Sequence, residues 1–147
     1  MSDLRAYPQR PILAVSAAII RDGKVLIVRR AREPALGVYT LPGGGVEIGE
    51  SLTEAIVREV REETALVIEP VALAGYREAI IRDTQGAVER HFVIVCFAAR
   101  WLSGEPVLND ELDEARWRNP AELAGLRTTE GLAGIVAAAF ERVALLR

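Results

Sequence analysis

Three glutamates share one side of a predicted helix, at a spacing that suits metal chemistry. Glu59, Glu62 and Glu63 stand at positions i, i+3 and i+4, and they continue the apolar stripe that begins at Leu52. Carboxylates on a packing face need compensation, because burial of an unpaired charge costs several kcal/mol and like charges repel. A hard divalent cation supplies it, and oxygen ligands suit Mg²⁺ or Mn²⁺. The pattern therefore favours a cation shared with the phosphates of a substrate.

The alternative for this helix is a solvated surface held by ion pairs. Glu54 with Arg58, and Arg58 with Glu62, are ordinary i,i+4 pairs. Taken alone, the helix favours that reading. The glycine-rich segment Leu41-Pro42-Gly43-Gly44-Gly45, at a fixed distance before the helix, favours the metal site instead.

The spacing of these residues resembles a known motif. From Gly44 the chain has five residues, Glu50, seven residues, and then Arg-Glu-Val-Arg-Glu-Glu-Thr-Ala-Leu over 58–66. This closely resembles the Nudix box (here 44–66) of the Nudix, or MutT-like, hydrolases. The resemblance extends to the two strands before the box and to Trp117–Leu123, and so covers roughly residues 10 to 145. Ala65 replaces the box glycine, which bears on the helix terminus but removes no ligand.

The resemblance implies roles for the residues that match the box. Glu59 and Glu63 are expected to be the principal metal ligands. Glu62 is expected to be a further ligand or to orient water, and the Gly44 carbonyl is expected to face the metal. Arg58 is expected to pair with a neighbouring glutamate and hold it in place.

The general base and the substrate contacts are less constrained. The base is either the second glutamate of the Glu-Glu pair, Glu63, or a residue of a late acidic loop over 110–114, where Glu111 is our first candidate. A solvated turn is an equal alternative for that loop. Arg29, Arg30, Arg77 and Arg90 are candidates to bind phosphate, as guanidinium groups do, and a strand-end charge is the alternative for each. Of these we take Arg30 and Arg90, together with Glu47, as the expected substrate contacts.

The implied activity is metal-dependent hydrolysis of a phosphoanhydride in a nucleoside diphosphate linked to another group. The segment Ser103–Trp117 is similar to the bacterial ADP-ribose pyrophosphatase-like branch, which suggests ADP-ribose or a nucleotide sugar. One alternative is a (deoxy)nucleoside triphosphate pyrophosphohydrolase. Another, of a different class, is a non-catalytic ligand-binding or regulatory module, which intact box glutamates disfavour.

The elements that must position these residues follow from local patterns. Apolar runs and turns predict strands over 12–20, 24–30, 67–82 and 89–101, with 41–45 outside any regular element. Ser51 and Glu54 form a capping-box pattern that starts a helix running to about Thr64. A short helix is expected over 120–123, and a final helix from about Thr129. The expected fold is one α/β domain over 1–147, a Nudix α/β/α sandwich with a mixed sheet flanked by helices.

Composition bounds the remaining possibilities. The chain has 147 residues, a formal net charge of −3 and one cysteine. The weak negative charge disfavours a nucleic-acid partner, and no apolar stretch is long enough to span a membrane. A small-molecule nucleotide is the expected partner, and a homodimer is one assembly state that we consider. A polar start without a signal peptide favours a cytoplasmic location.

Overall fold

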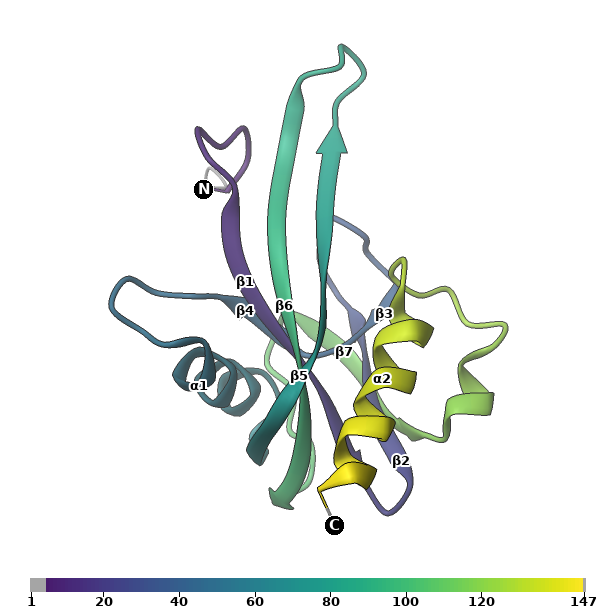
Figure 1. Ribbon diagram of the computed structural model, residues 1–147. Coiled ribbons are helices and arrows are strands. Elements are labelled where there is room, and N and C mark those ends of the chain that lie inside the picture. The colour runs from purple at the N-terminus through teal and green to yellow at the C-terminus, as the bar shows by residue number, and fades with distance from the viewer. Residues whose placement is uncertain (1–4, 147) are drawn as a thin grey trace.

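The computed structural model describes residues 5–146 as a mixed β-sheet between helices (Figure 1). Parallel pairing of β1 with β6 and antiparallel pairing elsewhere make the sheet mixed, in the order β3-β2-β1-β6-β5, with β4 on β1 and β7 on β2. The elements in this range are β1 (Ile12–Arg21), β2 (Lys24–Arg30), β3 (Tyr39–Thr40), β4 (Gly43–Gly45), α1 (Leu52–Thr64), β5 (Val67–Arg82), β6 (Val88–Ser103), β7 (Leu112–Arg118), the 3-10 helix η1 (Pro120–Leu123) and α2 (Leu132–Leu145).

The two helices cover opposite faces of the sheet, as Figure 1 shows. Alternate residues of a strand point to opposite faces, so β1 sends Val15 into the core beneath α1 and Ala18 into the core beneath α2. Ile56 of α1 and Val136 of α2 are fully buried in these two cores. The predicted α/β/α sandwich is confirmed. Within residues 5–146, no helix combines the length and the apolar character needed to cross a membrane.

The sheet forks at β1. Near the first hairpin turn β1 pairs with β2, at Ile20–Val25 and Arg21–Lys24, whereas farther back it pairs with β4 over residues 14–16. The long β5–β6 hairpin continues the sheet on the other side of β1 and projects beyond the helices (Figure 1). The fork leaves room between β2 and β4, and side chains from several elements line that space.

The glycine segment is a strand, which corrects our expectation that 41–45 lies outside any regular element. A Cβ atom on Gly43 would lie 2.0 Å from the Val15 carbonyl oxygen and 2.7 Å from the Ser16 Cα atom. Glycine is therefore what allows β4 to approach β1 closely enough to pair. Pattern-based reasoning missed this strand because glycine usually weakens strands.

The ends of α1 follow local rules. The Ser51 hydroxyl accepts a hydrogen bond from the Glu54 N–H, and the Glu54 carboxylate accepts one from the Ser51 N–H, which confirms the predicted capping box. At the other end Ala65 adopts a left-handed conformation, with φ of 63°, and its N–H donates to the Arg61 carbonyl. The helix thus ends in the left-handed cap that glycine would make, although an alanine occupies it.

The C-terminal third differs from expectation in two places. The acidic segment 110–114 is a loop only at its start, because Asp113 and Glu114 belong to β7, where Glu114 pairs with Arg29 of β2. The final helix begins at Leu132 and not near Thr129, since Gly131 just before it has a positive φ of 81°. The predicted short helix is the 3-10 turn η1, and Asn119 caps it.

Candidate active site

A cleft of about 780 Å³ opens at the fork of the sheet. It has the size typical of small-molecule sites. Most of the residues predicted to act together reach it from α1, the glycine strand, β2, β6 and the loop before β7. Those that line it are Gly44, Glu59, Glu62, Glu63, Arg30, Arg90 and Glu111. The structure therefore brings together side chains that are up to 81 positions apart in the sequence, from Arg30 to Glu111.

Glu63 is the most buried carboxylate of the cleft, with 5% of the residue exposed. Its Oε1 atom accepts a hydrogen bond of 2.7 Å from the Gly43 N–H. Burial, reinforced by the nearby Glu111 and Glu59 carboxylates, raises the pKa of Glu63 to about 8, although the Gly43 N–H opposes this shift. Within residues 5–146 Glu63 forms no ion pair within 4.0 Å. A bound cation would compensate the burial of such a carboxylate.

Gly44 and Glu59 fit against each other. A Cβ atom on Gly44 would lie 2.4 Å from Glu59 Oε2 and 2.5 Å from its Cδ atom. Any side chain at this position would therefore displace the carboxylate. Burial raises the pKa of Glu59, while the adjacent Arg58 guanidinium opposes the rise.

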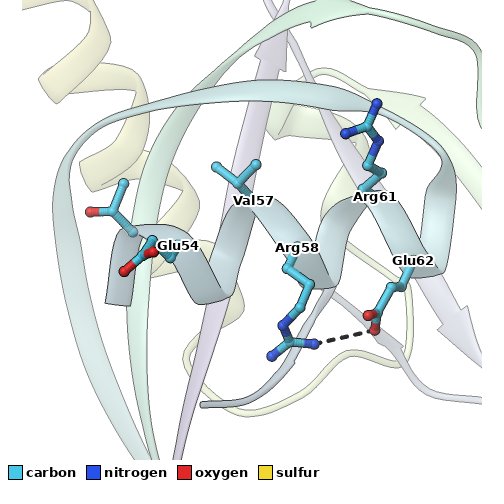
Figure 2. Close-up of a pocket in the computed structure, with 6 residues that line it drawn as sticks. Glu54, Val57, Arg58, Arg61 and Glu62 are labelled. Carbon is cyan, nitrogen blue, oxygen red and sulfur yellow. Dashed lines mark hydrogen bonds and ion pairs between the residues drawn. The ribbon is translucent and has the colours of Figure 1, made fainter. Parts of the chain in front are cut away.

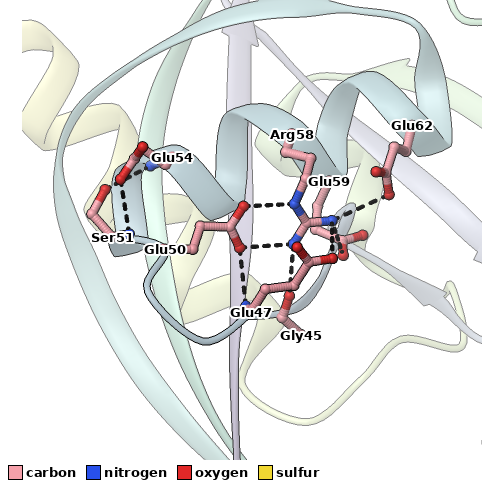
Figure 3. A network of polar contacts seen from close by, with 8 residues as sticks. All are labelled: Gly45, Glu47, Glu50, Ser51, Glu54, Arg58, Glu59 and Glu62. Atoms are coloured by element: carbon pink, nitrogen blue, oxygen red, sulfur yellow. Dashed lines mark hydrogen bonds and ion pairs between the residues drawn. The ribbon is translucent and has the colours of Figure 1, made fainter.

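Arg58 organises the loop beside the cleft, as Figure 3 shows. Its Nε and Nη2 atoms donate to the two Glu50 carboxylate oxygens at 2.6 and 2.9 Å, and Nη2 also donates to the Gly45 carbonyl at 3.0 Å. Its Nη1 atom donates to Glu59 at 2.9 Å and to Glu62 at 3.2 Å. These charge-assisted bonds raise the pKa of Arg58 and occupy its donor atoms. Arg58 lies outside the cleft lining and holds Glu59 in place.

Glu62 and Glu47 are more exposed than their predicted roles suggest. The Glu62 side chain is 57% exposed. The apolar stripe of α1 therefore continues through Glu59 and Glu63, whereas Glu62 lies at its edge. The Glu47 side chain is 70% exposed and lies 3.8 Å from Arg58, outside the cleft lining. Glu62 is therefore at the rim of the cleft, and Glu47 belongs to the Arg58 network.

Glu111 and Arg30 line the cleft close to Glu63. Backbone bonds fix Glu111, whose carbonyl accepts from the Ala31 N–H at 2.9 Å and whose N–H donates to the Asn109 side chain at 3.0 Å. Burial lowers the pKa of Arg30, while Glu63 and Glu111 oppose that shift. Sequence reasoning missed Asn109, and its position just before an acidic run was the available signal.

A second hollow, of about 560 Å³, lies on the outer side of α1 (Figure 2). Thr53, Glu54, Val57, Arg58, Arg61 and Glu62 line it. It does not include Glu59 or Glu63, and its charged groups are those of an ordinary solvated helix surface. The cleft at the fork is therefore the candidate active site.

The donor set of the cleft suits a hard divalent cation. Within residues 5–146, no three His, Cys, Asp or Glu side chains already converge on one metal position. Carboxylate oxygens and a glycine backbone are nevertheless the ligands that such cations prefer. The Glu59 carboxylate occupies the space that a side chain on Gly44 would fill, and it lines the cleft.

Known proteins show which family shares this fold and motif. The NUDIX domain model matches residues 10–138. An ADP-ribose pyrophosphatase of Methanocaldococcus jannaschii is 36% identical, over 78% of this chain and 67% of its own length. An NAD-capped RNA hydrolase NudC of Pseudomonas putida is 31% identical, over 89% of this chain, which spans only 44% of that relative.

Solved structures point to the same family. A MutT NUDIX hydrolase of Burkholderia pseudomallei has a TM-score of 0.74 at 30% identity, covering 92% of this chain and 99% of its own. The NUDIX domain of Shewanella oneidensis NrtR, solved with ADP ribose, has a TM-score of 0.68 at 27% identity, over 92% and 90% of the two chains. The fold and these relatives define a pyrophosphohydrolase. The chain belongs to the Nudix hydrolase family, as its motif predicted, and this family generally uses divalent metal ions.

Proposed function

We propose that this protein hydrolyses the phosphoanhydride bond of ADP-ribose or a related nucleoside diphosphate sugar, with Mg²⁺ or Mn²⁺ as its cofactor. The observation that carries the proposal is the buried Glu63 carboxylate beside the partly buried Glu59 carboxylate, in a cleft that arginines also line. The names of an archaeal relative and of the NrtR complex, which both include ADP-ribose, support this substrate class.

The residues around the cation divide into ligands and supports. Glu59 and Glu63 would hold it, together with the Gly44 carbonyl and with Glu62, which lines the cleft at its rim. When bound, the cation supplies acidification of the attacking water and neutralisation of diphosphate charge. Arg58 fixes Glu59 through the 2.9 Å hydrogen bond.

The reaction also needs a proton acceptor and a diphosphate clamp. Glu111 accepts the proton of the attacking water, because it lines the cleft near Glu63 and backbone bonds hold its main chain. Arg30 and Arg90 line the same cleft and orient the diphosphate, since guanidinium groups match phosphate geometry.

The experiment is a substrate panel with a matched pair of variants. Purified protein is assayed with Mg²⁺ or Mn²⁺ against ADP-ribose, ADP-glucose, UDP-glucose, dinucleotides and nucleoside triphosphates. ADP-ribose or a nucleotide sugar should give the highest kcat/KM, and turnover of triphosphates alone would overturn the substrate class. Glu63→Gln should lower kcat by about 100-fold or more. Glu54→Gln, on the same helix but outside the cleft, should leave it unchanged.

Location and assembly extend the proposal. We expect the protein to act in the cytoplasm, where nucleotide substrates occur, and its one cysteine, Cys96, is a buried free thiol. A homodimer is the assembly that we test for, by light scattering coupled to size-exclusion chromatography. Fractionation of expressing cells tests the location.

A further inference from the structure

The cleft continues past the carboxylates along one row of the sheet. Gly45 of β4, Ala14 of β1, Ile94 of β6 and Arg77 of β5 are direct neighbours across four consecutive strands. Adjacent strands lie about 4.8 Å apart, so the Arg77 Cα atom is about 14 Å from the glycine strand. The cleft is therefore long enough for a substrate that extends in both directions from its diphosphate.

The far part of the cleft, here called the far slot, is apolar on its walls. Its lining residues are Ala14, Arg77, Ala79, Ile94, Leu132 and Ile135. The sheet supplies the floor, and the first turn of α2 supplies the other wall. The helix packs closely there, since a Cβ atom on Gly75 would lie 2.9 Å from the Ile135 Cδ1 atom. At this contact the helix and the sheet touch, and the apolar walls beside it suit an apolar group.

Among these six residues Arg77 is the one with a polar side chain, and Ser16 and Cys96 lie nearby on the same face of the sheet. Arg77 is half-buried and makes no hydrogen bond or ion pair with another residue of the 5–146 range. Two other arginines of the cleft are engaged, because Arg30 donates to the Pro34 carbonyl at 2.7 Å and Arg32 pairs with Asp110 at 2.5 Å. The neighbouring Glu78 lies on the opposite face of β5, where it is exposed. The donor atoms of Arg77 are thus available to a ligand.

We propose that the far slot binds the nucleobase of the substrate and that Arg77 is a specificity-determining residue, donating hydrogen bonds to acceptor atoms on the base edge. This inference rests on the proposed function for its substrate class. The Arg77 Cα atom lies about 14 Å from the glycine strand across the sheet. That separation leaves room for a ribose between the diphosphate and the base.

The walls favour a base over the second sugar of the substrate. Sugar hydroxyls would lose their hydrogen bonds to water against Ala14, Ile94 and Ile135, and such losses are unfavourable. A base presents apolar faces to apolar walls and keeps its polar atoms at its edge, where one arginine meets them. Guanidinium donors distinguish bases by their acceptors, and they form paired bonds most readily with guanine.

The test measures binding of ADP, GDP and UDP, in the presence of Mg²⁺, by isothermal titration calorimetry. These ligands share the diphosphate and differ only in the base. The wild-type protein should bind them with Kd values that differ by about 10-fold or more. Arg77→Met should weaken the best of the three by about 10-fold and bring the three Kd values together. Arg82→Met, the same substitution on β5 outside the cleft lining, should change none of them.

Three results would overturn the inference: equal weakening of all three ligands by Arg77→Met, no weakening, or wild-type Kd values that do not depend on the base. Equal weakening would mean that Arg77 contacts the diphosphate. Arg77→Gln serves as a second variant, and equal thermal midpoints establish that the fold is intact. With ADP-ribose, KM should rise while kcat stays within about twofold, as expected for lost ground-state binding.

Failure of the proposed function is separable from failure of this inference. Binding of the nucleoside diphosphates requires no hydrolysis, so base discrimination that depends on Arg77 can be measured even if no panel compound turns over. Conversely, hydrolysis of ADP-ribose at an unchanged KM in Arg77→Met would retain the proposed function and remove Arg77 from substrate recognition.

Discussion

At position 44, the absence of a side chain decides where the Glu59 carboxylate lies. Three atoms of that carboxyl group would be within 2.8 Å of a Cβ atom on Gly44. On its other side, Glu59 accepts the Arg58 hydrogen bond. The carboxylate is therefore confined between the Gly44 backbone and the Arg58 guanidinium group. This confinement gives a predicted metal ligand a defined position.

We predict that Gly44→Ala removes activity while leaving the fold intact. The added methyl group must push the Glu59 carboxylate aside, so kcat/KM should fall by about 100-fold, as when a metal ligand is displaced. Steady-state kinetics measure this loss, and circular dichroism measures the fold.

Gly134→Ala is the control for this substitution. Gly134 lies within α2, where an added Cβ atom meets nothing within 4 Å. Activity should be unchanged and stability should rise by about 1 kcal/mol, because alanine favours helices. If Gly44→Ala retained full activity, Glu59 would not be positioned as we describe.

Among the elements, the loop between β4 and α1 depends on one arginine. Glu50 accepts two hydrogen bonds from Arg58, and it also accepts one of 3.0 Å from the Glu47 N–H. The Arg58 guanidinium, with help from that N–H, lowers the pKa of Glu50 from 4.5 to about 2. The folded state thus favours the ionised carboxylate, and the loop is tied to the helix that carries Glu59.

This pKa difference predicts an acid dependence of stability. A depressed pKa in the folded state contributes stability above pH 4.5, which is lost as the pH falls towards 2. Glu50→Gln should therefore be less stable than the wild type at pH 7, and the difference should shrink between pH 4.5 and 2. Urea unfolding across this range measures it. Glu69→Gln, which removes one half of an exposed pair with Arg100, should show little effect.

The sequence predicted most elements because their signals are local. The capping residues of α1, the apolar run of β1 and the turn between β5 and β6 each act on neighbouring residues. β4 and β7 were missed for a different reason. Gly43 pairs only because of its close approach to Val15, and Glu114 lies in a strand only because β2 is beside it. Such long-range pairing leaves no local pattern.

In the whole molecule, the residues that line the cleft affect both the stability of the fold and the binding of ligands. Burial of Glu63 without an ion pair in the described range costs stability, which a cation in the cleft would return. The motif predicted the residues on α1, because their spacing is fixed by one helix. It did not predict that Glu62 would lie at the rim, or that Arg77 would face the far slot, because both depend on how the sheet and α2 meet.

We predict that Mg²⁺ stabilises the whole protein. At about 100 times its Kd the ion should add about 2.7 kcal/mol, which raises the thermal midpoint by about 5 to 10 °C. Addition of EDTA should reverse this rise. Glu63→Gln should have a higher metal-free midpoint than the wild type, because an amide is less costly to bury, and its midpoint should not respond to Mg²⁺. An equal response in both proteins would remove Glu63 from the cation site.

The fork in the sheet has a consequence for how this protein can change over evolutionary time. The proposed metal-binding glutamates and their supports come from one continuous stretch, from Gly43 to Glu63, whereas the far slot is assembled from β1, β5, β6 and α2. Mutations in the second group leave the first untouched. New substrates are therefore accessible by drift at Arg77, Ile94 or Ile135 without loss of the hydrolytic chemistry. A mutant library restricted to those three positions should yield altered nucleotide preferences among variants that remain active.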